Sequence, residues 1–232
     1  TQDDIEVTFT HVPERVIAAN ANAGDQLMAM GLGDKIIGRA YTNSVINPEW
    51  NDEYLKIPEL SETAPSLEAI LAQEPDFIYG RSSAFSEKNN TEHETLSGYD
   101  IMSLASIEGY TIGADVDVVY EDFYNLGRIF DLEEKADEIV EEMKAQIEAA
   151  EKAVKDQETV KVFVYDMAQD GGAYTCGNNF TAKLIEHAGG KNIFSDMDKT
   201  WANVSWEEVV ERAPEVIVIN LSLIHISEPT RH

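Results

Sequence analysis

The sequence predicts an α/β protein with two similar lobes, each containing a mainly parallel sheet flanked by helices, joined by a long rigid helix. Two observations carry this prediction. Short apolar runs alternate with amphipathic stretches in both halves of the chain, a pattern typical of βαβ units. A continuous helical pattern separates the two halves. The 232 residues are enough for one to two domains.

The first half of the chain alternates predicted strands with predicted helices. The apolar run 16–19 predicts a strand, and 24–30 predicts a helix that ends at Gly31. Ser66 is a suitable N-cap for a second helix over 66–72. Further strands are predicted over 35–38, 76–80 and 99–104. Helices between successive strands favour a parallel sheet.

The middle of the chain is predicted to be helical. Apolar residues recur at spacings of three and four from Val118 onwards, and a second series of this kind runs from Leu132 to Val154. Gly127 and Asp131 indicate a break between two helices. The second helix would form a rod about 34 Å long, which is enough to connect two domains. Its many Glu and Lys residues are typical of a solvated helix face.

The second half repeats the pattern of the first, beginning with a strand over 160–165. Residues 66–78 and 205–217 carry Ser, Glu, Pro, an acidic residue and Ile at matching offsets. Upstream, 25–38 resembles 182–194, because both lead from a short helix through a Gly pair into an apolar strand. An internal duplication is the simplest explanation. We predict a first lobe over 1–114, a helical rod over 115–156, a second lobe over 157–220 and a tail over 221–232.

The composition is strongly acidic. The chain has 44 Asp and Glu residues against 17 Lys and Arg, which gives a formal net charge of −27. Phosphate backbones are bound by Lys and Arg that release counterions, so we expect no nucleic-acid partner. There is one cysteine, Cys176, which excludes an internal disulfide. The first residues lack the basic and apolar regions of a signal peptide, so an exported protein would have lost its targeting segment.

Polar and aromatic residues follow the predicted strands in both lobes. Open α/β sheets bind ligands at the carboxyl ends of their strands, and pockets favour domain interfaces. Arg39 and Arg81 are candidates for an anion clamp, although each could instead pair with one of the many acids. The aromatic side chains could stack on a flat ligand. We expect a cleft between the lobes, lined by Asn20, Asn22, Arg39, Tyr41, Arg81, Ser82, Ser83, Phe85, Tyr174, Trp201 and Asn203.

Several segments together resemble one family of transport proteins. The segments are 13–17, 27–38, 66–76 and 204–217. In order and spacing they are similar to the helical-backbone substrate-binding proteins of ABC importers, which capture ferric siderophores, haem or cobalamin. The resemblance implies an exported protein, periplasmic or lipid-anchored, that delivers a metal chelate to a membrane permease. A ferric siderophore is the expected ligand, with haem, cobalamin or a bare metal ion as alternatives.

The same resemblance implies further properties. One Glu on the outer surface of each lobe engages arginines of the permease in the family, and the matching positions are Glu68 and Glu207. The alternative is that each is an acid stabilised by the dipole of its helix. We expect no resident cofactor, since the iron would be chelated by the ligand, and we expect a monomer.

The sequence also contains residues for two other kinds of site. The cluster Glu92-His93-Glu94, with His11 elsewhere, is the one compact group with ligand chemistry for a bare metal, but a solvated loop explains it better. A hydrolytic enzyme is the remote alternative, because the sequence lacks a Gly-x-Ser-x-Gly elbow and a dinucleotide fingerprint. Cys176 with His187 as a base would need an electropositive site. We therefore expect no catalytic residues and no protein-bound metal.

The end of the chain departs from the family pattern. The residues from Leu221 to His232 match no expected element and resemble translated adapter sequence. The strand predicted over 99–104 in the first lobe also has no counterpart after 216–220. We therefore expect a truncated second lobe with an exposed sheet edge that is prone to aggregation.

Overall fold

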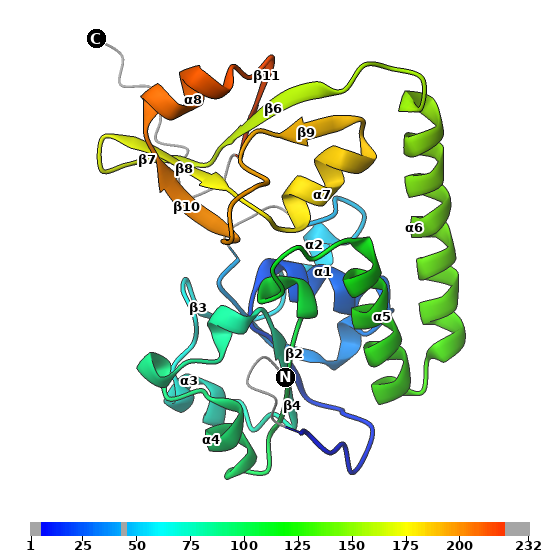
Figure 1. Cartoon of the computed structure of the whole chain (residues 1–232). Coiled ribbons are helices and arrows are strands. Elements are labelled where there is room, and N and C mark those ends of the chain that lie inside the picture. The colour runs from blue at the N-terminus through cyan, green and yellow to red at the C-terminus, as the bar shows by residue number, and fades with distance from the viewer. Residues whose placement is uncertain (1–5, 43–45, 221–232) are drawn as a thin grey trace. The chain divides into compact units, whose positions relative to one another are not determined.

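A computed structural model describes residues 6–42 and 46–220 of the chain (Figure 1). The chain divides into two compact units, which are described separately. Unit 1 comprises Thr1–Tyr110 and Tyr120–Ile139, and unit 2 comprises Thr111–Val119 and Val140–His232. The two central helices are each shared between the units. Among the described residues, no helix has the length and apolar character needed to cross a membrane.

Unit 1 is built on a five-stranded sheet in which every pair of neighbouring strands is parallel, as the sequence predicts. β1 (Val16–Ala18) and β4 (Phe77–Gly80) are buried along their whole length. Their continuous apolar runs are typical of strands that are covered on both faces. The sheet order is β3 (Glu59–Ser61), β2 (Ile36–Ala40), β1, β4 and β5 (Met102–Ala105).

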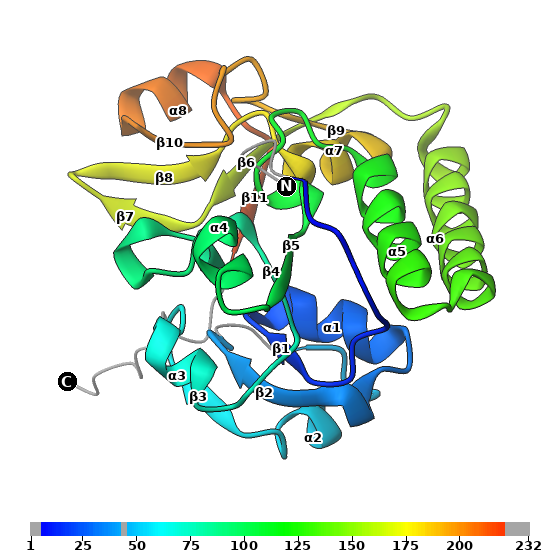
Figure 2. The same ribbon diagram turned by 90° about the horizontal axis from the view of Figure 1, so that it is seen from below.

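Helices cover both faces of this sheet (Figure 2). On one face, Ile17 and Ile78 form a core with residues of α3 (Leu67–Leu71) and α4 (His93–Ser97). On the other face, the Phe77 ring packs edge-on against Phe130, 5.9 Å away. The unit also contains α1 (Ala21–Ala29), α2 (Asn51–Tyr54), and the short 3-10 helices Gly33–Lys35, Ser82–Ala84, Glu87–Asn89 and Ile107–Gly109.

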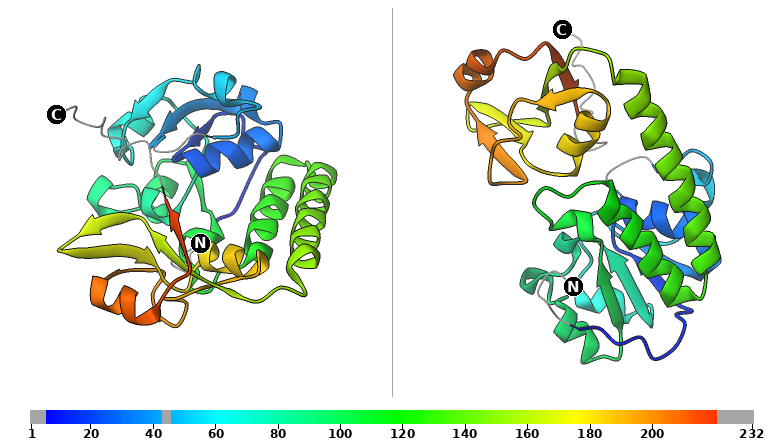
Figure 3. Two further views of the ribbon diagram at one scale, coloured as in Figure 1. Left: turned by 90° about the horizontal axis from the view of Figure 1, so that it is seen from above. Right: turned by 45° about the vertical axis from the view of Figure 1, so that its right-hand side comes forward.

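The helical middle of the chain is two helices, α5 (Val116–Phe130) and α6 (Glu133–Val154). Asp131 adopts a positive φ of 55°, and the Leu132 N–H donates to the Gly127 carbonyl, which ends α5. A Cβ at Gly127 would lie 2.9 Å from the Ala136 Cβ, so glycine is needed where the helices meet. The predicted break and the long second helix are both present (Figure 3).

Unit 2 contains a smaller parallel sheet. β6 (Val160–Tyr165) lies between β11 (Val216–Ile219) and β9 (Gly190–Asn192). Phe163 on β6 packs with Phe194 and with Val209 of α8 (Trp206–Arg212). α7 (Phe180–His187) precedes β9 in the chain and packs against it.

A second sheet of unit 2 is antiparallel, which the sequence did not predict. β8 (Gly172–Cys176) lies between β7 (Met167–Gln169) and β10 (Trp201–Val204). Asp170 and Gly171 join β7 to β8 with φ values of 49° and 78°. Two positive φ values match the right-handed twist of a hairpin, and Asp-Gly is a strong sequence signal for such a turn. The parallel sheet predicted for the second lobe is therefore present, and the antiparallel sheet is an addition to it.

The internal duplication is visible in the topology. The order β2-β1-β4 of unit 1 is matched by β9-β6-β11 of unit 2. In unit 1, Asp76 accepts the Arg15 N–H at 2.9 Å, and its own N–H donates to the Arg15 carbonyl. In unit 2, Glu215 accepts the Lys161 N–H at 2.9 Å and returns its own N–H to the Lys161 carbonyl. The repeated acidic residue therefore has the same structural role in both units.

The two units differ at one edge of the sheet. β5 pairs with β4 in unit 1, whereas β11 pairs with β6 alone among the described strands. All four β11 side chains are exposed, and Ile217 is 60% exposed. The apolar edge expected from the sequence is therefore present. The predicted tail over 221–232, with His225 and His232, lies outside the described residues.

Candidate functional site

The carboxyl ends of β1, β4 and β5 are tied together in unit 1. Asn20 lies two residues after the end of β1, as the N-cap of α1. It is 4% exposed, and its Oδ1 accepts the Arg81 N–H at 3.0 Å. The Ser82 hydroxyl donates to the Gly109 carbonyl at 3.1 Å. A Cβ at Gly80 would lie 2.8 Å from the Ala19 Cβ, so glycine allows β1 and β4 to end side by side. The structure thus brings together Asn20, Arg81 and Ser82, and their role in ligand binding stays a prediction.

Arg81 carries its own carboxylate partner. Its Nη2 lies 3.2 Å from Oε2 of Glu108, and the two side chains are 41% and 11% exposed. The Ser106 hydroxyl donates to the other Glu108 oxygen at 3.3 Å. The sequence prediction missed Glu108, although it lies just beyond β5, where the same rule about strand ends applies.

A buried acid in α5 holds the loop that carries Glu108. The Asp122 carboxylate accepts the Ile107 N–H, with its two oxygens 3.0 and 3.1 Å away. Burial raises the pKa of Asp122 to about 7, although the bond from Ile107 opposes this shift. Asp122 therefore fixes the backbone next to Glu108.

Arg39 is not available as a ligand-binding residue. Its side chain is 9% exposed and forms an ion pair with Glu59 at 3.2 Å. The guanidinium also donates to the Ile57 carbonyl at 3.0 Å and to the Thr42 hydroxyl at 2.9 Å. The Tyr54 ring lies beneath it, with 5.9 Å between Cζ and the ring centroid. These contacts fix the β2–β3 edge, so the geometry argues against the predicted clamp of two arginines.

The other predicted residues of unit 1 differ in how far they are exposed. Asn22 and Ser83 are exposed, and Tyr41 is half-buried with a positive φ of 47°. Phe85 is 5% exposed and stacks on His93, with ring centroids 4.3 Å apart. Phe85 therefore belongs to the core, and its assignment to the ligand site is disfavoured by its burial.

The predicted residues of unit 2 share one face of the antiparallel sheet. Tyr174 and Trp201 stack with ring centroids 5.8 Å apart and an angle of 14° between their planes. Tyr174 is directly opposite Asn203 on β10 and Met167 on β7, so these side chains share a face. Both aromatic residues are half-buried and Asn203 is exposed. We call Tyr174, Trp201, Asn203 and Met167 the aromatic face; Met167 was not predicted.

Glu68 and Glu207 occupy equivalent positions in their helices. Ser66 and Ser205 are the N-caps, and each side chain accepts an N–H three residues later, from Ala69 and Glu208. Both glutamates are exposed. Hydrogen bonds from its own backbone N–H and from Ser66 lower the pKa of Glu68. The structure thus places the two acids alike, and their docking role stays a prediction.

The structure places Cys176, His187 and His93 in surroundings that do not favour the alternative chemistry. Burial raises the pKa of Cys176 to about 12, which disfavours a thiolate. His187 bonds to Asp115 and Glu151 instead of serving Cys176. His93 is 1% exposed and bonds to Ser103 at 2.7 Å, so it is a core residue rather than part of a solvated loop. Within the described ranges, no three His, Cys, Asp or Glu residues are grouped to hold a metal.

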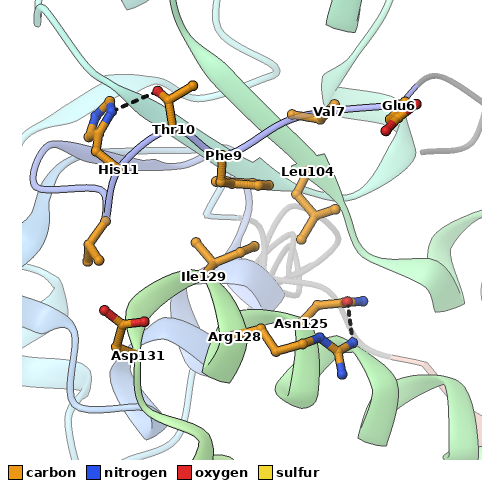
Figure 4. Close-up of a pocket in the computed structure, with 11 residues that line it drawn as sticks. Glu6, Val7, Phe9, Thr10, His11, Leu104, Asn125, Arg128, Ile129 and Asp131 are labelled. Carbon is orange, nitrogen blue, oxygen red and sulfur yellow. Dashed lines mark hydrogen bonds between the residues drawn. The ribbon is translucent and has the colours of Figure 1, made fainter.

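One hollow of unit 1 lies apart from the predicted residues. It has a volume of about 640 Å³, and the chain before β1 and helix α5 line it (Figure 4). Val7, Phe9 and Ile129 give it an apolar lining. Arg128, which also lines it, is bonded to Glu121 and, at 2.7 Å, to Asn125. None of the predicted ligand residues contributes to its lining.

Comparisons with known proteins place the chain in a family. Residues 16–228 match the model of the periplasmic binding protein family. A cobalamin-binding protein of Halobacterium salinarum is 26% identical over 219 residues, covering 93% of this chain and 56% of the relative. The chain thus spans little more than half the length of that relative.

Solved structures agree with this assignment. A periplasmic binding protein from Veillonella parvula superposes with a TM-score of 0.84 at 27% identity, over 90% of this chain and 71% of that one. A protein of an ABC-type Fe³⁺-hydroxamate transport system from Saccharomonospora viridis gives a TM-score of 0.75 at 29% identity, over 93% and 76%. The duplicated parallel sheets and the long α6 helix are therefore those of a known fold, and the chain belongs to the periplasmic binding protein family.

Proposed function

We propose that this protein is the solute-binding component of an ABC importer, that it captures a metal chelate, and that it is not an enzyme. The observation that carries the proposal is the aromatic face of unit 2. The half-buried stack of Tyr174 and Trp201, with Asn203 beside it, suits a flat or macrocyclic ligand. Asn20, Arg81 and Ser82 would supply polar contacts from unit 1.

The charge of the site favours an uncharged chelate. Arg39 is paired with Glu59 and Arg81 with Glu108, so neither predicted arginine offers an unneutralised positive charge. A polyanionic ferric catecholate would lack the cations that its charge requires. Among siderophores, the proposal therefore prefers a neutral ferric hydroxamate. Cobalamin is the second candidate, because it also presents amide groups and a flat macrocycle to polar and aromatic side chains.

Partners and location follow from the same proposal. The protein would act outside the cytoplasmic membrane, in the periplasm or held by a lipid anchor, as a monomer that binds no nucleic acid. Glu68 and Glu207 would contact arginines of the permease, one from each unit. Their equivalent, exposed positions at capped helix starts support this role.

A fluorescence titration tests the ligand class. Tryptophan emission would be followed while a neutral ferric trihydroxamate, a ferric tricatecholate, haem or cobalamin is added. We expect saturable quenching with the hydroxamate or with cobalamin. Replacing Trp201 with Ala should weaken that binding by about three- to tenfold through loss of stacking. Trp50→Phe is the matched control, because Trp50 donates to Asp25 in unit 1 and is not on the aromatic face. Absence of saturable quenching with all four compounds would contradict the proposal.

A further inference from the structure

Glu108 is a largely buried partner of Arg81, not an exposed surface acid. Its side chain is 11% exposed, whereas Arg81 is 41% exposed, so the acid is the more deeply placed member of the pair. Ser106 donates to Glu108, and Asp122 holds the adjacent Ile107 N–H. The carboxylate is therefore held in place, while the guanidinium reaches solvent.

The backbone on the Arg81 side is fixed as well. Asn20 accepts the Arg81 N–H, and Ser82 bonds to the carbonyl of Gly109, the residue after Glu108. The two loops that carry the ion pair are thus joined directly. A ligand that approaches the guanidinium at the ends of β4 and β5 would meet Glu108 as part of the same surface.

We propose that Glu108 determines charge selectivity, acting as a built-in counter-ion that lets Arg81 donate hydrogen bonds to a neutral chelate while opposing a polyanionic one. The inference rests on the proposed function and deepens it by assigning the selectivity to one residue. A neutral chelate gains a charged donor from Arg81 without disturbing the ion pair. A trianionic chelate would face the Glu108 carboxylate at short range in a partly buried site, where like charges repel strongly.

The variant Glu108→Gln tests this selectivity. Dissociation constants would be measured for a trianionic ferric tricatecholate and a neutral ferric trihydroxamate, with circular dichroism to confirm the fold. We expect the affinity for the tricatecholate to rise by about tenfold or more, and that for the trihydroxamate to change by less than about twofold. Glu108→Asp keeps the charge and should retain the wild-type preference.

Two controls isolate the contact with Arg81. Glu87→Gln removes the same charge from an exposed position of unit 1 and should leave the selectivity unchanged. In the double variant Arg81→Gln/Glu108→Gln, the net charge of the pair equals that of the wild type, so most of the gain for the tricatecholate should disappear.

The outcomes separate the two proposals. If wild-type protein binds a chelate but Glu108→Gln leaves the ratio of the two affinities unchanged, the assignment of Glu108 is wrong and the proposed function stands. An equal effect of Glu87→Gln would also overturn the assignment. If neither the wild type nor any variant binds a chelate, the proposed function fails and the inference falls with it.

Discussion

At the scale of single residues, one acid in each unit joins the start of one strand to the start of another. Asp76 accepts two backbone N–H groups, from Glu14 at 2.8 Å and from Arg15 at 2.9 Å. Glu215 accepts the Lys161 N–H in the corresponding place of unit 2. An acid is suited to this position because a carboxylate can accept several N–H bonds and strengthens each by its charge.

Replacing Asp76 with Ala should destabilise unit 1. Two N–H groups would lose a charged acceptor, and the expected loss is about 1 to 3 kcal/mol of unfolding free energy. Urea unfolding followed by circular dichroism measures it. Glu62→Ala is the control, because Glu62 is exposed and should change stability by less than about 0.5 kcal/mol. Equal midpoints for the two variants would show that the Asp76 bonds contribute nothing.

At the scale of elements, one histidine joins three segments of unit 2. His187, the last residue of α7, places Nδ1 2.7 Å from the Glu151 carboxylate on α6. Its Nε2 lies 2.7 Å from Asp115, which directly precedes α5. Both ring nitrogens can donate only when the imidazole is protonated. Lys183 and Glu186, on the same helix as His187, form an ion pair at 2.7 Å.

The stability that this contact contributes depends on pH, because it depends on the charge of the His187 side chain. Burial lowers the pKa of His187, but its hydrogen bonds to Asp115 and Glu151 outweigh that effect and raise it overall. For Asp115, burial raises the pKa, and the bonds from His187 and from the Val116 N–H outweigh it, so the net shift is downward. A raised histidine pKa contributes stability that is complete below its ordinary value, about 6.5, and is lost as pH rises through the raised value.

The stabilising effect of His187 should therefore have an optimum in weak acid. The difference in urea midpoint between wild type and His187→Gln should be largest between about pH 4 and pH 6.5 and should shrink at higher pH as the imidazole loses its proton. It should also shrink in stronger acid as Asp115 becomes protonated. His11→Gln is the control, because the His11 side chain is 53% exposed in unit 1, and its contact with Asp76, 3.6 Å away, should contribute little. A difference that does not vary with pH would mean that the contact acts as a neutral one.

At the scale of the whole molecule, the sequence identifies the repeated elements better than it identifies the contacts between them. Apolar runs and a capping serine predict β1, β4 and α3, because these signals are local. The role of Arg39 could not be predicted, because its partner Glu59 lies on a neighbouring strand that the sequence prediction missed. Glu108 was missed for a related reason: its pairing with Arg81 depends on the register of β4 and β5.

The exposed edge strand β11 leads to a prediction about self-association. Ile217 and Ile219, opposite Phe163 and Tyr165 of β6, are 60% and 59% exposed. An exposed apolar strand that pairs on one side within the described residues is a template for strands of other molecules, and a lysine on such an edge opposes the pairing.

Ile217→Lys should therefore reduce aggregation. We expect static light scattering at high protein concentration to fall, with unchanged circular dichroism. Val210→Lys is the matched control, because it removes an apolar side chain that is 75% exposed on α8 and makes the same change in charge. If both variants reduce scattering equally, exposed apolar area or net charge drives association. If Ile217→Lys alone reduces it, association proceeds through the backbone edge of β11.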